Sequence, residues 1–162
     1  MNTSTPDILV VGGAGYIGSH VVKALRDAGR QPVVFDNLST GLRENLFPEI
    51  PFIHGDLLIP EQVRAAMRGI RSVIHLAALK AAGDSMLEPE RYALHNLNGT
   101  VNLLHAAGTA GVRHFVFSSS AAVYGEPQYL PLDENHPTEP ANFYGQTKLQ
   151  IEMLLSWFSR LR

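Results

Sequence analysis

The chain has 162 residues, about the length of one domain, and is long enough to bury an adequate core. Its formal net charge is −2 and charged residues make up 17% of it, so we expect no polyanion-binding surface and no nucleic-acid partner. The sequence has no cysteine, which excludes disulfides, thiolate zinc sites and cysteine nucleophiles.

No segment is typical of a targeting or membrane-spanning sequence. Residues 1–7 have neither a basic patch nor an apolar core of signal length. The longest apolar stretch, residues 73–79, is interrupted by His75 and is far too short to span a bilayer. The seven histidines are scattered without ligand spacing, so no metal site is expected. We therefore expect a soluble cytoplasmic protein without a membrane partner.

Short apolar runs alternate with helical patterns along the whole chain. The predicted elements, in order, are strand 8–11, helix 19–28, strand 32–35, strand 51–54, helix 60–68, strand 72–76, helix 89–107, strand 114–117, loop 121–142 and helix 144–161. Strands that alternate with helices predict an α/β fold with a doubly wound parallel sheet, Rossmann-like, of about five strands with helices on both faces. We expect it to form a single domain over residues 1–162.

A glycine-rich string joins the first strand to the first helix. It contains Gly13-x-Gly15-x-x-Gly18, and Gly12 begins an overlapping Gly-x-x-Gly-x-x-Gly pattern. Glycines at this spacing allow a tight turn, a close approach of the backbone to a pyrophosphate, and close packing of helix on strand. The helix start offers its N–H groups and the positive end of its dipole to phosphates. The string therefore predicts a dinucleotide site.

Acidic residues follow the second and third strands. Asp36 lies 18 residues after Gly18, where a carboxylate can accept both adenosine ribose hydroxyls and would repel a 2′-phosphate. This favours NAD over NADP, although Arg43 lies nearby in the sequence. Asp56 follows the third strand and is a candidate partner for the adenine amino group, or alternatively a turn or capping residue.

Tyr144 and Lys148 begin the last predicted helix, four residues apart on one face. A phenol is a poor base because its unperturbed pKa is about 10. A nearby cation favours the phenolate, which is a useful base for a sugar hydroxyl near neutral pH. An isolated Tyr-x-x-x-Lys is usually an ordinary helix face, but the glycine string upstream favours the catalytic interpretation.

Seven strings together resemble the extended short-chain dehydrogenase/reductase family, and within it the UDP-glucose 4-epimerases. They are GGAGYIGSH at 12–20, DNLSTG at 36–41, GD at 55–56, HLAALKAAGDS at 75–85, NLNGT at 96–100, FVFSSSAAVYGEP at 115–127 and YGQTKLQIE at 144–152. Lys80 is similar to the epimerase version of its string. Ser120-Ala121 stands where sugar-nucleotide 4,6-dehydratases carry an acidic pair, which disfavours those relatives.

The resemblance implies an NAD-dependent isomerase of galactose metabolism that interconverts UDP-glucose and UDP-galactose by transient oxidation at sugar C4. It implies that Tyr144 is the acid/base, that Lys148 holds the nicotinamide ribose, and that Ser120 hydrogen-bonds the reacting sugar oxygen. The implied substrate-binding residues are Lys80, Ser120, Ala122 and Tyr144. The implied cofactor-binding residues are Gly12, Gly13, Gly15, Tyr16, Ile17, Gly18, Asp36, Asn37, Leu38, Ser39, Thr40, Gly41, Asp56, Leu57, Leu76, Ala77, Ala78, Lys80, Asn96, Tyr144 and Lys148.

Members of this family are roughly twice as long, so the chain is expected to be truncated, without the C-terminal substrate domain. Two hypotheses stay open: an epimerase, or its cofactor half completed by a second chain, and a truncated NAD-binding module without turnover. Epimerisation of another nucleotide sugar is a further alternative. The family also implies a homodimer through helices 89–107 and 144–161.

Overall fold

A computed structural model describes residues 6–161 and divides the chain into two compact units. The first unit contains residues up to 78 together with 102–118, and the second contains 79–101 together with the chain from 119 onward. The expectation that the chain has no signal segment concerns mainly residues 1–5, which lie outside the described residues. Along residues 6–161, no helix combines the length and apolar character needed to cross a bilayer.

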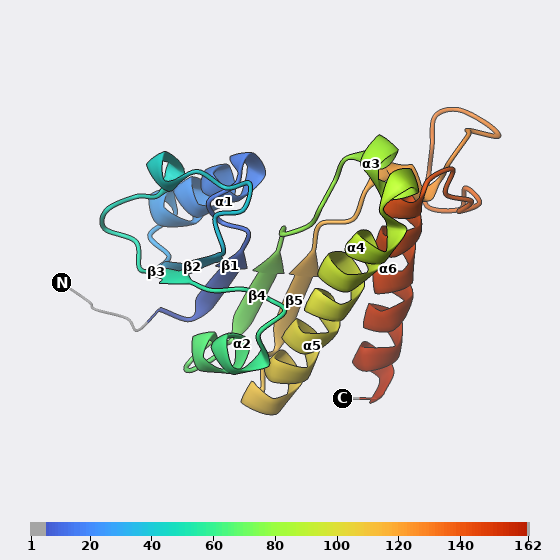
Figure 1. The fold of residues 1–162 in the computed structure, drawn as a ribbon. Coiled ribbons are helices and arrows are strands. Elements are labelled where there is room, and N and C mark those ends of the chain that lie inside the picture. Colours follow the sequence, from blue (N-terminus) through green and yellow to red (C-terminus); the bar gives the residue numbers. More distant parts are fainter. Residues whose placement is uncertain (1–5, 162) are drawn as a thin grey trace. The chain divides into compact units, whose positions relative to one another are not determined.

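The first unit is built on a five-stranded parallel sheet with the order β3-β2-β1-β4-β5 (Figure 1). Its strands are β1 (Ile8–Val11), β2 (Pro32–Asp36), β3 (Phe52–His54), β4 (Ser72–His75) and β5 (His114–Phe117). Within the described chain, β5 pairs only with β4 and so forms one edge. Its helices are α1 (Tyr16–Asp27), the short 3-10 turn η1 (Arg43–Asn45), α2 (Pro60–Ala66) and residues 102–110 of α5 (Gly99–Ala110).

Successive residues of β1 are buried against opposite faces of this sheet, because side chains alternate along a strand. Ile8 and Val10 pack with Val22 of α1 on one face, whereas Leu9 and Val11 pack with α2 and α5 on the other. Helices therefore cover both faces, and all four residues of β1 are buried. The predicted Rossmann-like parallel sheet is confirmed.

The second unit is helical. It contains α3 (Ala82–Leu87), α4 (Pro89–Tyr92), the π-helix η2 (Ala93–Asn98), the first three residues of α5, the 3-10 turn η3 (Ala121–Val123) and the long helix α6 (Phe143–Leu161). Helices α3, α4 and η2 all pack against α6 (Figure 1). Helix α6 is therefore the element that the other helices of this unit share as a packing partner.

The structure of this part of the chain differs from the predicted elements in three places. The region expected to be one helix over 89–107 is α4, η2 and α5 in succession, because the backbone widens into a π-helix at Ala93–Asn98. Helix α3 was missed, because its sequence, AGDSML, shows no apolar periodicity. The loop expected over 121–142 contains η3 at its start.

Candidate functional site

The turn between β1 and α1 has the tight geometry that its glycines predict. Gly12 has a φ of +84°, and a Cβ built on it would lie 2.6 Å from the Ala77 backbone nitrogen. A Cβ on Gly18 would lie 2.1 Å from the Gly12 carbonyl oxygen. Gly13 is equally confined, since its Cβ would meet the Val34 side chain at 2.8 Å. The turn therefore leaves no room for a side chain at Gly12, Gly13 or Gly18.

The amino end of α1 leaves this turn without a side-chain cap. Gly15 is the N-cap, and no side chain accepts a hydrogen bond from the first turn of the helix. The first N–H groups of a helix lack intrahelical acceptors and carry the positive end of the helix dipole. Tyr16 and Ile17, which begin the helix, are 77% and 59% exposed. This combination of bare amides and a close-packed glycine turn fits a pyrophosphate.

Asp36 ends β2 beside the glycine turn. Its Oδ2 accepts a hydrogen bond from the Ala14 N–H at 3.0 Å, and its Oδ1 accepts one from the Leu38 N–H at 2.8 Å. The second bond stabilises Leu38 at a φ of +56°, a conformation that residues other than glycine rarely adopt. Each carboxylate oxygen has a second lone pair, so both remain able to accept from ribose hydroxyls. A Cβ on Gly41 would meet Asp36 Oδ1 at 3.0 Å, so the 36–41 segment folds back on the carboxylate.

Asp56 makes a comparable set of contacts after β3. Its Oδ2 accepts from Asn37 Nδ2 at 2.9 Å, and its Oδ1 accepts from the Leu58 N–H at 2.8 Å. The capping or turn role considered for Asp56 is therefore present in the structure. The same contact brings Asn37 of the segment after β2 to the segment after β3. Leu57, another residue predicted to bind cofactor, is half-buried against the core.

The segment after β4 completes the predicted cofactor residues of the first unit. Leu76 and Ala77 both donate their N–H groups to the Val11 carbonyl, at 2.8 and 3.1 Å. This ties residues 76–77 to the end of β1, directly before the glycines. Ala78 is half-buried and ends the first of the two chain segments that form this unit. The predicted residues of this unit thus follow the carboxyl ends of β1, β2, β3 and β4. These ends lie on the same side of the sheet because its strands are parallel.

Tyr144 and Lys148 lie one turn apart at the start of α6. The Lys148 Nζ lies 5.9 Å from the centroid of the Tyr144 ring. Lys148 is buried, and this desolvation lowers its pKa from the ordinary 10.5 to about 8. The side chain therefore stays mainly cationic at neutral pH, where its charge can stabilise a phenolate on the neighbouring ring.

Ser119 and Ser120, which follow β5 in the sequence, belong to the second unit, as α6 does. The Ser120 hydroxyl accepts a hydrogen bond from the Ala122 N–H at 3.2 Å and so caps η3, which leaves its hydrogen able to donate. Ser119 is different, because its hydroxyl donates to the Glu152 carboxylate on α6. Ala122, predicted to touch substrate, is half-buried. Ser119 therefore holds α6, and Ser120 is the serine whose donor remains available.

Lys80 and Asn96 belong to a second group in the same unit. Lys80 is exposed. It follows Leu79, whose N–H donates to Asn96 Oδ1 at 2.9 Å and whose carbonyl accepts from Asn96 Nδ2 at 3.0 Å. Asn96 also donates to Thr147 Oγ1 at 3.1 Å. The predicted residue Asn96 thus links the segment that carries Lys80 to the turn of α6 that carries Tyr144 and Lys148.

Sequence reasoning missed two residues in this unit, Ser85 and Thr147. The Ser85 hydroxyl accepts from the Tyr144 N–H at 3.0 Å, and Thr147 donates to the Tyr144 carbonyl at 2.7 Å. Both are fully buried. No periodicity or spacing predicts either contact, since Ser85 lies 59 residues before Tyr144 and Thr147 reads as a neutral position in its string.

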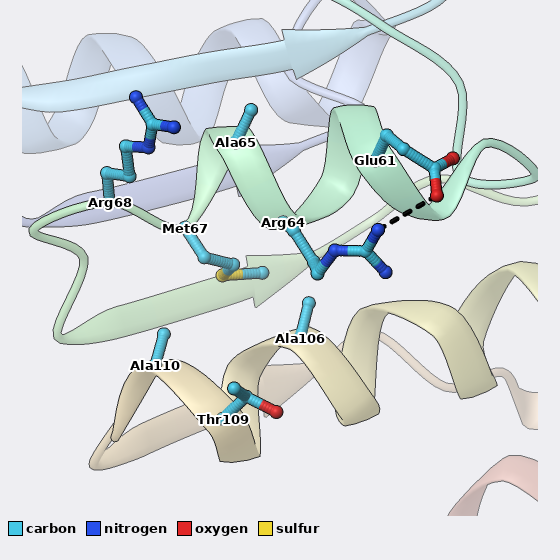
Figure 2. A pocket seen from close by; sticks show the side chains of 8 residues that line it. All are labelled: Glu61, Arg64, Ala65, Met67, Arg68, Ala106, Thr109 and Ala110. Atoms are coloured by element: carbon cyan, nitrogen blue, oxygen red, sulfur yellow. Dashed lines mark hydrogen bonds and ion pairs between the residues drawn. The ribbon is translucent and has the colours of Figure 1, made fainter.

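A hollow with a volume of about 380 Å³ lies between α2 and α5 of the first unit (Figure 2). Its side chains include Met67 and the ion pair between Arg64 and Glu61, whose atoms are 2.8 Å apart. None of its lining residues is among those predicted to bind cofactor or substrate. In the part of the chain that the structure describes, no group of three or more His, Asp or Glu side chains is placed to hold a metal ion.

The parallel sheet and its glycine turn define a Rossmann-type dinucleotide-binding protein. Residues 8–161 match the family described as NAD dependent epimerase/dehydratase, and the chain belongs to this family. It is similar to the UDP-glucose 4-epimerase of Streptomyces lividans, at 44% identity over 151 residues, which cover 91% of this chain and 46% of that protein.

Solved structures of UDP-glucose 4-epimerases are similar in fold as well. The Brucella ovis enzyme, in complex with NAD, has a TM-score of 0.93 at 40% identity, covering 97% of this chain and 49% of the other. The Thermotoga maritima enzyme, with UDP-glucose, has a TM-score of 0.92 at 37% identity, covering 96% and 52%. The chain thus spans about half the length of the relatives it matches.

Proposed function

We propose that the chain is the NAD-binding and acid/base part of a UDP-glucose 4-epimerase, which interconverts UDP-glucose and UDP-galactose. The observation that carries this proposal is a pair of features in one chain. A glycine turn without room for side chains precedes an uncapped helix, and Tyr144 begins a helix beside the buried cation of Lys148. The similarity to enzymes solved with NAD and with UDP-glucose supports the choice of cofactor and substrate.

In this proposal the first unit holds NAD. The α1 amides and the glycine turn bind the pyrophosphate, and Asp36 accepts the adenosine ribose hydroxyls. The Asp36 carboxylate also disfavours the 2′-phosphate of NADP, because two anions would face each other. Asp56 and Asn37, already hydrogen-bonded to each other, border the adenine.

The second unit supplies the proton chemistry. The Tyr144 phenolate accepts the proton of the sugar 4-hydroxyl and later returns it to the same oxygen on the epimerised sugar. Bound NAD supplies the hydride acceptor and donor at C4, so the reaction has no net redox change. Lys148, as an ammonium, stabilises the phenolate and holds the nicotinamide ribose, and Ser120 donates a hydrogen bond to the reacting sugar oxygen.

Turnover of UDP-galactose to UDP-glucose by the purified chain, followed by chromatography with NAD present, tests this function. Tyr144→Phe removes the acid/base and is expected to lower the rate by about 100-fold or more, since general acid–base catalysis contributes about 10²–10⁴-fold. Tyr129→Phe is the matched control, because that phenol is 43% exposed and bonds only within its loop, to Asp133. Its rate is expected to equal the parent rate.

Retention of NAD without turnover would instead support an NAD-binding module that needs a second polypeptide. That arrangement has an observation in its favour. Val116 on the edge strand β5 is 57% exposed, whereas the four residues of β1, in the middle of the sheet, are at most 5% exposed. Absence of both NAD binding and turnover would contradict the proposal as a whole.

We also propose a homodimer through the helical segments 89–107, which comprises α4, η2 and most of α5, and 144–161, which lies in α6. Met153, Trp157 and Leu161 follow one another at four-residue spacing, so they share one face of α6. Large exposed apolar residues on one face are typical of an interaction surface. The exposed apolar residues on the two helical segments are Leu94, Val101, Met153, Trp157 and Leu161.

A further inference from the structure

The amino end of α6 is fixed partly by another helix. The first N–H groups of a helix have no intrahelical acceptor. Asn142, at the N-cap, accepts from the Gly145 N–H through its side chain at 2.8 Å. The Tyr144 N–H instead donates to Ser85 Oγ, on α3, at 3.0 Å. The backbone amide of the proposed acid/base is therefore held from a different element of the same unit.

Ser85 can accept this hydrogen bond because the hydrogen of its own hydroxyl is engaged elsewhere. It is fully buried and donates to the Ala82 carbonyl at 2.6 Å, so its oxygen presents a lone pair to Tyr144. The neighbouring Met86 adds a weaker contact, since its sulfur accepts from the Phe143 N–H at 3.4 Å. Helix α3 thus supplies acceptors for two successive amides at the start of α6.

The carbonyl of Tyr144 is fixed as well. Thr147 Oγ1 donates to it at 2.7 Å and accepts from Asn96 Nδ2 at 3.1 Å. The Asn96 amide is oriented in turn, because it exchanges two hydrogen bonds with the Leu79 backbone. A hydroxyl has one hydrogen, so the direction of each bond in this chain is determined. The π-helix around Asn96 is a distortion often found at functional sites.

We propose that Ser85, together with Thr147, is a positioning residue that fixes the backbone of Tyr144 and so aims its phenol beside Lys148. This inference rests on the proposed function of Tyr144 and Lys148. Neither Ser85 nor Thr147 touches substrate or cofactor in it. Both act by fixing the two polar backbone groups of the residue that does, and misplacement of a reacting group by about 1 Å can lower a rate by about 100-fold.

The test compares Ser85→Ala and Thr147→Val with the conservative variants Ser85→Thr and Thr147→Ser. Thr109→Val is the matched control, since Thr109 on α5 also donates from its hydroxyl to a helical carbonyl, that of His105, at 2.9 Å, but lies outside this hydrogen-bond chain. The first readout is turnover of UDP-galactose. We expect Ser85→Ala and Thr147→Val each to lower kcat by about 10-fold or more with KM little changed. The conservative variants should keep at least about a third of the parent kcat. The kcat of Thr109→Val should match that of the parent.

The second readout does not need turnover. The sequence has three lysines, at 23, 80 and 148, so NMR of ¹³C-labelled lysine can follow the titration of Lys148 alone. In the parent chain its midpoint is expected near pH 8. A loosened α6 start admits water, so the midpoint in Ser85→Ala and Thr147→Val should rise by about half a unit or more. The conservative variants and Thr109→Val should keep the parent midpoint.

Distinct results separate the two proposals. A parent chain without turnover or NAD binding contradicts the proposed function, while the Lys148 titration still measures the positioning effect. Lower thermal stability with an unchanged Lys148 midpoint and unchanged kcat in both disruptive variants would overturn the positioning role and leave a purely structural cap. If Ser85→Ala does not fold, Thr147→Val and Thr147→Ser decide the question by the same criteria.

Discussion

Replacement of Gly18 by alanine tests the phosphate-binding turn. The new Cβ would lie 2.1 Å from the Gly12 carbonyl oxygen and 2.7 Å from Gly13 Cα, and both obstacles are backbone. Ordinary contact begins at 3.4 Å, so the turn would have to open by about 1.3 Å, the difference between 3.4 and 2.1 Å. Overpacking of this kind destabilises proteins by about 1–3 kcal/mol. It also moves the α1 amides that are proposed to hold the pyrophosphate.

The assay is isothermal titration with NAD, together with urea unfolding of the same samples. We expect Gly18→Ala to weaken NAD binding by about 10-fold or more and to lower the free energy of unfolding by about 1–3 kcal/mol. Gly83→Ala is the control, because a Cβ there meets nothing within 4 Å and the residue lies in helix α3. That variant should bind NAD like the parent and gain up to about 1 kcal/mol. Parental NAD affinity in Gly18→Ala would refute the assignment of the turn.

Three further predictions concern other parts of the molecule. The lowered pKa of Lys148 means that the unfolded chain binds its proton more tightly, so the free energy of unfolding should rise between pH 8 and 10.5, by at most about 3.4 kcal/mol. Lys148→Met should abolish that rise in urea titrations at several pH values. Asp36→Asn turns an N–H group toward the N–H of Ala14 or Leu38, so two donors would face each other. We expect this variant to lower the free energy of unfolding by about 1–3 kcal/mol in the same assay and to weaken NAD binding. Unchanged stability would contradict the two hydrogen bonds. Trp157→Glu should convert the proposed dimer to monomer in sedimentation velocity, and a parent that is already monomeric would contradict the dimer.

The centre of the sheet was predictable because β1 and β2 are buried on both faces. A parallel strand covered by helices appears as a continuous apolar run, and β1 begins and ends where its run does. Helix ends were predictable where a glycine adopts positive φ. Gly29 and Gly69, at +72° and +76°, follow α1 and α2 as expected.

Helix α3 and the π-helix were not predictable, for physical reasons. Helix α3 has six residues, including Gly83, and buries Ser85 rather than an apolar stripe, so no hydrophobic period marks it. The sequence of the π-helix at Ala93–Asn98, ALHNLN, contains no residue type that separates it from an α-helix. What distinguishes it is the Asn96 amide, which is hydrogen-bonded to Leu79 and Thr147, 17 and 51 residues away.

The residues of the candidate site also differ in how far the sequence predicts them. Glycine spacing indicated the phosphate-binding turn because only backbone fits there, and that property is local in sequence. The residues that hold Tyr144 are polar side chains from separate helices, and their contacts exist only once those helices pack. The roles assigned to Tyr144, Lys148 and Ser120 stay predictions until variants are assayed.

Native mass spectrometry of the purified chain incubated with NAD tests the central claim most directly. We expect one bound NAD for each protomer, and loss of that bound mass in Gly18→Ala but not in Gly83→Ala. A parent chain that shows no NAD at concentrations that saturate its relatives, or a Gly18→Ala variant that retains NAD as well as the parent does, would contradict it.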